Sequence, residues 1–303
     1  MAMNTFGENW TFTSFGESHG AAIGGVLDGV PAGLHIDMNL IRQELGRRAG
    51  KGMAGASPRA KNEPDEVEWL SGVLDGVTLG TPIAFIIRNK DARPEDYEWL
   101  KHTYRIGHAD KVYELKYGIR DWRGGGRASA RETAARVVAG CIAKQQLAQK
   151  NIAIHAQLIQ VGDETDPARF ADTIAAYQQD GDSIGGIIEC RIQGLPVGTG
   201  EPIFDKLQAR LAFAILSINA CKGFEYGTGF GGVTQPGSAI NAISGGIAGG
   251  ISDGTEVVFR CVFKPTPSTP KAGIKGRHDA CVATRAVPVV EAMTAIALID
   301  LLS

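Results

Sequence analysis

The chain has 303 residues, with 31 Lys and Arg against 33 Asp and Glu, 40 glycines and five cysteines. This length suffices for a large core, and the slightly negative net charge argues against nucleic-acid binding as the main function. No apolar run reaches the ~18 residues of a membrane span. The cysteines lie far apart without a CxxC spacing, so we expect reduced thiols, no metal site and a cytoplasmic location.

Apolar periodicity predicts strands and helices that alternate along the chain. In chain order, we expect a strand at residues 22–27, a helix at 37–48, a strand at 83–88, a helix at 131–149, strands at 152–161 and 186–192, a helix at 204–218, a strand at 256–263 and a helix at 287–302. The last helix is apolar nearly all round, so it is deeply buried or lies in a subunit interface. No Pro- or Ser-rich linker divides the chain, and we predict a single domain, residues 1–303, of mixed α and β structure.

A short glycine-rich pattern recurs along the chain. Gly-Val-Leu-Asp-Gly-Val stands at residues 25–30 and again at 72–77, and a related Gly-Leu-Pro-Val-Gly stands at 194–198. In each case the pattern suggests a turn that joins one element to the next. The recurrence predicts an internally repeated plan, and its irregular period excludes a solenoid.

Positive charge gathers in three segments although the chain is acidic overall. Residues 42–61 carry six basic side chains and one acidic, residues 101–136 carry nine and four, and residues 264–285 carry five and one. Solvated surface loops are the simplest interpretation of any one segment. Because all three are interleaved with Gly, Ser or His, we favour a shared site for a small anion.

The most informative segment is residues 105–136, in which four arginines surround the triple glycine 124–126. Glycine lets a backbone approach its neighbours closely, and arginine binds carboxylates and phosphates through two parallel hydrogen bonds. Ser129 and Glu132 have the spacing of a capping box, which indicates a helix start, and a helix start also attracts anions. The segment therefore predicts a site for a small, multiply anionic ligand.

Three histidine-containing motifs are further candidates for chemistry. Ser18 and His19 lie between glycines 16 and 20, which predicts a tight, accessible turn; neighbouring side chains usually point apart, so we do not expect the two to form a pair. His108 follows Gly107 and precedes a carboxylate by two residues. Asp279 follows His278 in a basic loop, whose default interpretation is a salt-bridged surface turn.

Taken in order, GESHG, GHAD, RGGGRASARET and GRHDAC resemble the chorismate synthase family, over residues 6–302. The resemblance implies an α+β fold, a β-α-α-β sandwich with helices packed between antiparallel sheets, in a homotetramer. It also implies a lyase that converts 5-enolpyruvylshikimate 3-phosphate to chorismate and phosphate by 1,4-elimination, the last step of the shikimate pathway. The family depends on reduced FMN, for which NADPH is a candidate source of electrons. The substrate's two carboxylates and phosphate fit the three basic segments.

The resemblance also implies roles for individual residues. The catalytic set is His19, His108 and Asp279. The arginines expected to bind substrate are Arg48, Arg123, Arg131 and Arg285. The residues expected to bind FMN are Arg127, Ala128, Ser129, Asn219, Ala220, Gly249, Lys264, Pro265, Thr266, Pro267, Ser268 and Arg277.

The chain departs from the family in several local features. Segments 232–245 and 265–275 lack insertions that the family has near the flavin, and Lys51 is the nearest candidate for a second family arginine after Arg48. Ala242 replaces an expected Asn, and Pro267 replaces a small hydroxyl residue. These losses leave open an inactive relative that binds FMN or another anion. An NADPH-dependent flavin reductase and a nucleic-acid-binding protein are weaker alternatives, since a dinucleotide fingerprint and aromatic platforms are absent from the sequence.

Overall fold

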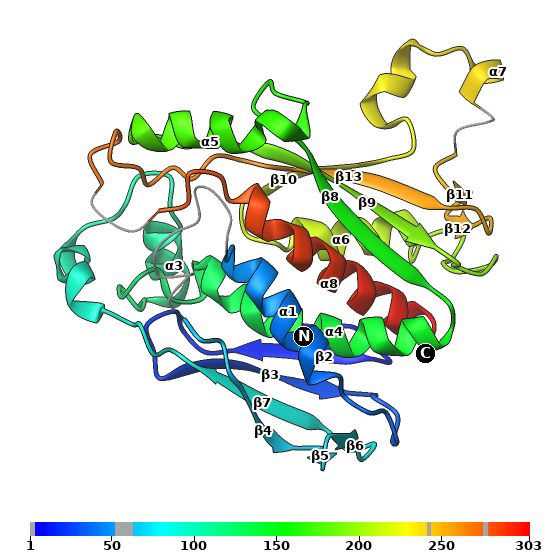
Figure 1. Cartoon of the computed structure of the whole chain (residues 1–303), viewed down its shortest axis with the longest axis horizontal. Coiled ribbons are helices and arrows are strands. Elements are labelled where there is room, and N and C mark those ends of the chain that lie inside the picture. The colour runs from blue at the N-terminus through cyan, green and yellow to red at the C-terminus, as the bar shows by residue number, and fades with distance from the viewer. Residues whose placement is uncertain (1–3, 52–62, 241–243, 275–277) are drawn as a thin grey trace.

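The computed structural model describes residues 4–51, 63–240, 244–274 and 278–303. Two antiparallel sheets enclose a layer of helices (Figure 1). The first sheet has the order β1-β2-β3-β7-β4. Its strands are β1 (Thr5–Phe6), β2 (Thr11–Phe15), β3 (Ala22–Asp28), β7 (Ile83–Arg88) and β4 (Val67–Ser71).

The second sheet has the order β10-β13-β9-β8. Its strands are β10 (Cys221–Tyr226), β13 (Val257–Phe263), β9 (Gly186–Gln193) and β8 (Ala153–Val161). In β13 and β9, buried side chains alternate with partly exposed ones, as expected for strands that cover a core on one face. Two small hairpins, β5 (Val73–Leu74) with β6 (Val77–Thr78) and β11 (Ile247–Ala248) with β12 (Ile251–Ser252), lie beside the sheets.

Helices α1 (Met38–Ala49), α4 (Thr133–Gln149), α6 (Leu207–Leu216) and α8 (Ala283–Leu301) form the layer between the sheets (Figure 1). Asp37 caps α1 by accepting the N–H groups of Asn39 and Leu40, and Gly50 ends it with a φ of 68°. Helix α5 (Phe170–Gln179) lies outside the second sheet, and α3 (Asp110–Tyr117) and α7 (Gly237–Ile240) lie at the periphery.

Helix α8 is the centre of the molecule. It packs against α1, α4, α6, β8 and β9, and nearly all its residues are buried, which confirms the prediction of a deeply buried helix. Among the described residues, no helix has the length and apolar character that crossing a membrane would require. The helix begins at Ala283, four residues before the predicted start, and Pro288 lies inside it.

The two halves of the chain repeat the same plan. The order of the larger elements is β2, β3, α1, β4, β7, α4 in the first half and β8, β9, α6, β10, β13, α8 in the second. The corresponding strand orders, β2-β3-β7-β4 and β8-β9-β13-β10, are identical. The predicted internal repeat and sandwich are therefore confirmed. The glycine-rich patterns at 25–30 and 194–198 lie at the ends of the equivalent strands β3 and β9, whereas the copy at 72–77 forms the β5–β6 hairpin.

Candidate active site

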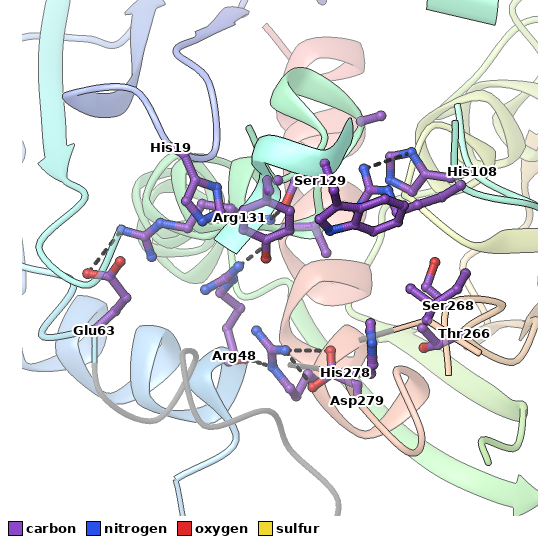
Figure 2. Close-up of a pocket in the computed structure, with 18 residues that line it drawn as sticks. His19, Arg48, Glu63, His108, Ser129, Arg131, Thr266, Ser268, His278 and Asp279 are labelled. Atoms are coloured by element: carbon purple, nitrogen blue, oxygen red, sulfur yellow. Dashed lines mark hydrogen bonds and ion pairs between the residues drawn. The ribbon is translucent and has the colours of Figure 1, made fainter. Parts of the chain in front are cut away.

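A pocket of about 210 Å³ opens where α4 and α8 begin and α1 ends. Segments distant in sequence supply its wall: the β2–β3 turn, the 105–131 segment and the 266–285 segment (Figure 2). The described residues that line it include three histidines and four arginines, namely His19, His108, His278, Arg48, Arg105, Arg131 and Arg285. All three residues expected to be catalytic, His19, His108 and Asp279, lie on this one pocket.

His19 is almost fully buried at one side of the pocket. Its Nδ1 lies 3.0 Å from the hydroxyl oxygen of Ser18, so the expectation that these neighbours point apart is wrong. The two residues lie in a turn, where side chains do not alternate as they do along a strand. The ring also meets the edge of Tyr97, with centroids 4.8 Å apart. The imidazole is thus oriented by contacts on two sides.

The triple glycine allows two histidines to approach the same loop. A Cβ at Gly124 would lie 2.1 Å from His19 Nδ1, and a Cβ at Gly125 would lie 2.7 Å from His108 Cε1. Both glycines have positive φ, at 63° and 91°. The sequence indicated a loop that approaches a ligand closely; the structure shows that it approaches the two histidines.

His108 stands on the opposite side from His19, just before α3 (Figure 2). Its Nδ1 lies 2.8 Å from a carboxylate oxygen of Asp110, which is also held by the guanidinium of Arg105. Burial opposes the ionised carboxylate, but hydrogen bonds from Arg105 and His108 outweigh it and hold the pKa of Asp110 far below its usual range. The carboxylate of Asp110 is therefore ionised when it faces His108.

Arg48, Arg131 and Arg285 form the basic side of the pocket. Arg131 pairs with Asp65, and Arg48 Nη1 lies 3.5 Å from the same carboxylate. Arg285 donates to both oxygens of Asp279, at 2.8 and 2.6 Å, and its Nε donates to the Arg48 carbonyl. These contacts hold the guanidinium groups in place before any ligand arrives.

The positive charge of Arg48 is only partly compensated by the carboxylates around it. Burial and the nearby charge of Arg285 lower its pKa, and the attraction of Asp65 only partly compensates. Asp65 lies nearer to Arg131 than to Arg48, and Arg131 has Glu63 as a second carboxylate 4.0 Å away, so Arg48 is the less well compensated of the two. An incoming carboxylate or phosphate would complete this charge balance.

The other side of the pocket is neutral. Ala128, Ser129, Thr266 and Ser268 line it, and Figure 2 shows the last two below His108 and away from Arg48. The Ser129 hydroxyl accepts from the Arg131 N–H, so it caps the short turn before α4, while Glu132 pairs with Arg136 instead of closing the expected capping box. Asn219 donates to the Ala128 carbonyl, and its buried Oδ1 has no hydrogen-bond partner in the described part of the chain.

Several predicted site residues do not line this pocket. The guanidinium of Arg123 pairs with Asp121, and that of Arg127 donates to Gly16 and Ser14 in the turn region that carries His19. The Lys264 N–H bonds the Ala220 carbonyl behind the neutral side. Pro265 and Pro267 pack near Gly185 and Gly107.

Gly249 lies farther away still. It occupies the β11–β12 turn, at the end of the second sheet opposite the 264–280 segment (Figure 1). Arg277, and Ala242 among the departures, lie outside the described residues.

Apart from the glycine loop, seven pocket residues had no role in the sequence interpretation, namely Glu63, Tyr97, Trp99, Arg105, Ala130, Ile274 and His278. Arg105 and His278 stood inside motifs already singled out, so a signal for them was present in the sequence. His278 has a lowered pKa, because burial disfavours its charged form, and its Nε2 is buried without a partner among the described residues. Glu63, Tyr97 and Trp99 had no distinguishing signal.

Fixed arginines facing histidines and a carboxylate, in a pocket at helix ends, define an enzyme that acts on a small anionic molecule. A family model described as chorismate synthase matches residues 10–302. The chorismate synthase of Christiangramia forsetii is 46% identical, over 99% of this chain and 97% of that protein. The chorismate synthase of Phocaeicola vulgatus is 45% identical, over 98% and 97%. The chain belongs to the chorismate synthase family of enzymes.

The comparison with solved structures agrees. A crystal structure of chorismate synthase superposes with a TM-score of 0.78 and 30% identity, covering 98% of this chain and 92% of that one. The alignment with the Christiangramia forsetii relative spans 348 positions, more than the 303 residues of this chain. That relative therefore carries internal segments that this chain lacks, in agreement with the departures seen in the sequence.

Proposed function

We propose that the chain converts 5-enolpyruvylshikimate 3-phosphate to chorismate and phosphate by 1,4-elimination, with reduced FMN as cofactor. The observation that carries this proposal is the convergence of His19, His108 and Asp279 on the pocket that Arg48, Arg131 and Arg285 also line. These residues come from four separate segments, so a surface salt-bridged turn does not account for them.

The basic side is suited to the substrate's anionic groups. Arg48, Arg131 and Arg285 present guanidinium groups that Asp65 and Asp279 hold in fixed orientations. Loss of phosphate concentrates negative charge on the departing group, and positioned guanidinium groups stabilise that charge. Arg123 remains a candidate for substrate binding only if its pair with Asp121 opens.

The neutral side fits the flavin ring. Small side chains leave room for a flat molecule, and Asn219, which lines a small adjoining cavity rather than the pocket itself, has an unpartnered Oδ1 and donates to the Ala128 carbonyl. We assign Ala128, Ser129, Asn219, Thr266 and Ser268 to this contact. When bound, reduced FMN supplies electron density that assists the elimination.

The remaining described residues that were predicted to bind FMN do not line the pocket of this chain. Arg127 holds the turn that carries His19, and Ala220, Lys264, Pro265 and Pro267 shape the neutral wall. Gly249 lies too far along the sheet to reach the pocket of its own chain, so its assigned contact requires a neighbouring subunit of the proposed cytoplasmic homotetramer.

Proton transfer falls to His19, His108 and Asp279. The two imidazoles face the pocket from opposite sides, where they can accept and donate protons (Figure 2). The resemblance links Asp279 to removal of the C6 proton through the flavin, and its pair with Arg285 places its carboxylate beside the basic side.

An anaerobic assay with dithionite-reduced FMN and 5-enolpyruvylshikimate 3-phosphate tests the proposal. We expect equal release of phosphate and chorismate. Binding of FMN without phosphate release would instead support the inactive relative. Aerobic NADPH oxidation in the presence of FMN would reveal a flavin reductase.

Replacement of His108 by Ala tests the acid–base assignment. We expect turnover to fall by roughly 10²–10⁴, the usual range for loss of a general acid or base. His155→Ala is the matched control, because His155 is exposed on β8, far along the chain from every predicted catalytic residue. A His108→Ala enzyme within threefold of the wild type would remove this residue from the mechanism.

A further inference from the structure

Asp110 is the first residue of α3 and its side chain is only 2% exposed. None of the predicted catalytic or binding roles involves it. Its carboxylate nevertheless lies between two side chains of the pocket wall, those of Arg105 and His108.

The hydrogen bonds of this carboxylate can be counted. Oδ2 accepts from the Arg105 backbone N–H at 3.0 Å and from Arg105 Nε at 2.9 Å. Oδ1 accepts from Arg105 Nη2 at 2.9 Å and lies 2.8 Å from His108 Nδ1. An ionised carboxylate has about four lone-pair sites. Three are occupied by Arg105, so the fourth is complete only if His108 Nδ1 carries a hydrogen.

The competing contact is weaker. Arg105 Nη2 also lies 3.1 Å from His108 Nδ1, which would be a hydrogen bond if Nδ1 were unprotonated. That tautomer would place the Nδ1 lone pair 2.8 Å from a negatively charged oxygen, which is repulsive. Arg105 Nη2 has a second N–H that points to Nδ1, but this contact, at 3.1 Å, is longer than the 2.8 Å between Nδ1 and the Asp110 oxygen.

We infer that Asp110 is a positioning residue that fixes the tautomer of His108, with Nδ1–H donated to Asp110 and Nε2 directed to the glycine loop and the pocket. The geometry of Gly125 agrees, because a Cβ there would lie 2.9 Å from Nε2. The neutral ring then presents a lone pair at Nε2, and the same nitrogen carries the proton after transfer. The expected effect of this tautomer on turnover rests on the proposed function, whereas the tautomer itself does not.

The tautomer is measurable without any activity. Solid-state ¹⁵N spectra of protein labelled on the histidine rings distinguish N–H from bare ring nitrogens, and His108→Gln identifies the signals of His108 by their loss. The wild type is titrated upward in pH until these signals stop moving. We expect the neutral ring to be protonated at Nδ1. Protonation mainly at Nε2 in the wild type would overturn the inference, whether or not any variant folds.

Asp110→Asn supplies the second arm. The amide oxygen can accept from Arg105, which leaves the amide NH₂ facing His108 and favours a bare Nδ1. We expect the tautomer to switch to Nε2–H, and kcat to fall by about 10²–10⁴ with KM changed less than threefold. A folded Asp110→Asn protein with an unchanged tautomer contradicts the inference.

Two controls separate positioning from general damage. Arg105→Lys removes the guanidinium fork but keeps Asp110, so the tautomer should stay Nδ1–H whatever happens to KM. Asp300→Asn replaces another buried carboxylate by an amide. That carboxylate accepts from the backbone N–H groups of Glu8, Asn9 and Trp10, so the change should lower stability without changing the His108 tautomer. If the wild type shows Nδ1–H but no lyase activity, the proposed function fails while the tautomer assignment stands.

Discussion

Arg47 and Arg48 are neighbours in the last turn of α1, yet their side chains enter two differently built charge clusters. Arg47 belongs to an interhelical network with Glu44, Lys144 and Glu291, in which Glu291 lies 2.8 Å from Arg47 and 2.6 Å from Lys144. Glu291 also accepts the Ala156 backbone N–H, so the network ties α1, α4, α8 and β8 together. Arg48 belongs to the pocket, with Arg131 and Arg285.

The two clusters differ in how their charge is balanced. In the interhelical network two carboxylates face two cations, and although burial opposes the charge of Arg47, Glu291 and Glu44 outweigh it and raise its pKa. At Arg48, burial and Arg285 prevail and the pKa is lowered. The pocket arginines Arg48, Arg131 and Arg285 also have three carboxylates nearby, those of Glu63, Asp65 and Asp279, but at Arg48 these do not offset burial and the charge of Arg285. The difference indicates that the network maintains the fold and that the pocket awaits an anion.

Arg47→Met should break the network and spare the pocket. Removal of one cation leaves Glu291 buried with Lys144 alone, and we expect the free energy of unfolding to fall by about 2–3 kcal/mol, below the full cost of breaking a buried pair because Arg47 is partly exposed. Chemical denaturation measures this. The KM for 5-enolpyruvylshikimate 3-phosphate should change less than threefold, and a larger change would mean that the two clusters are coupled.

Arg48→Met should show the reverse pattern. Arg48→Met loses hydrogen bonds to Thr133 and Ala130, but it also removes a charge that burial and Arg285 oppose, and Asp65 keeps Arg131 as its partner. Because these effects offset one another, we expect the free energy of unfolding to stay within about 1 kcal/mol of the wild type. The KM should rise roughly tenfold to a hundredfold, as for loss of one charged hydrogen bond. Steady-state kinetics and denaturation of the same preparations test both parts. A loss of stability equal to that of Arg47→Met would contradict the contrast between the clusters.

The core elements of this fold could be predicted from periodicity, since β3, β7, β13, α4 and α8 have regular apolar spacing. Strands β2 and β10 were missed because Thr and Ser, or Lys and Gly, interrupt that spacing. Their place is set by pairing with β3 and β13, which depends on contacts distant in sequence.

The site was predicted in its location but not in its internal contacts. Arg123 was assigned to the substrate from the family resemblance, whereas Arg105 in the same basic segment had no role, and only the fold shows that Arg123 pairs with Asp121 while Arg105 reaches the pocket. Glu63 lies far along the chain from the recognised motifs, so its approach to Arg131 had no local signal. The sequence thus indicates a segment rich in arginines, and the tertiary structure determines which of these arginines pair with carboxylates of the same chain and which face the pocket.

The triple glycine offers the finest test of the contrast between fold and pocket. Gly124 and Gly118 have similar positive φ values, 63° and 76°, but a Cβ at Gly124 would lie 2.1 Å from His19 Nδ1, whereas a Cβ at Gly118 meets nothing within 4 Å. Alanine at either position costs about 1 kcal/mol of backbone strain. Alanine at Gly124 must in addition displace the His19 ring.

We therefore expect Gly124→Ala to lose more stability than Gly118→Ala, since it must also move a buried ring, and Gly124→Ala alone to lose roughly tenfold in turnover, because a small displacement of an acid–base group is costly. Thermal denaturation measures the loss of stability in both variants, and the anaerobic assay measures the difference in turnover. Equal turnover in the two variants would show that Gly124 serves only the backbone. A selective loss would show that the missing side chain, and not the φ angle, is what the pocket requires of this glycine.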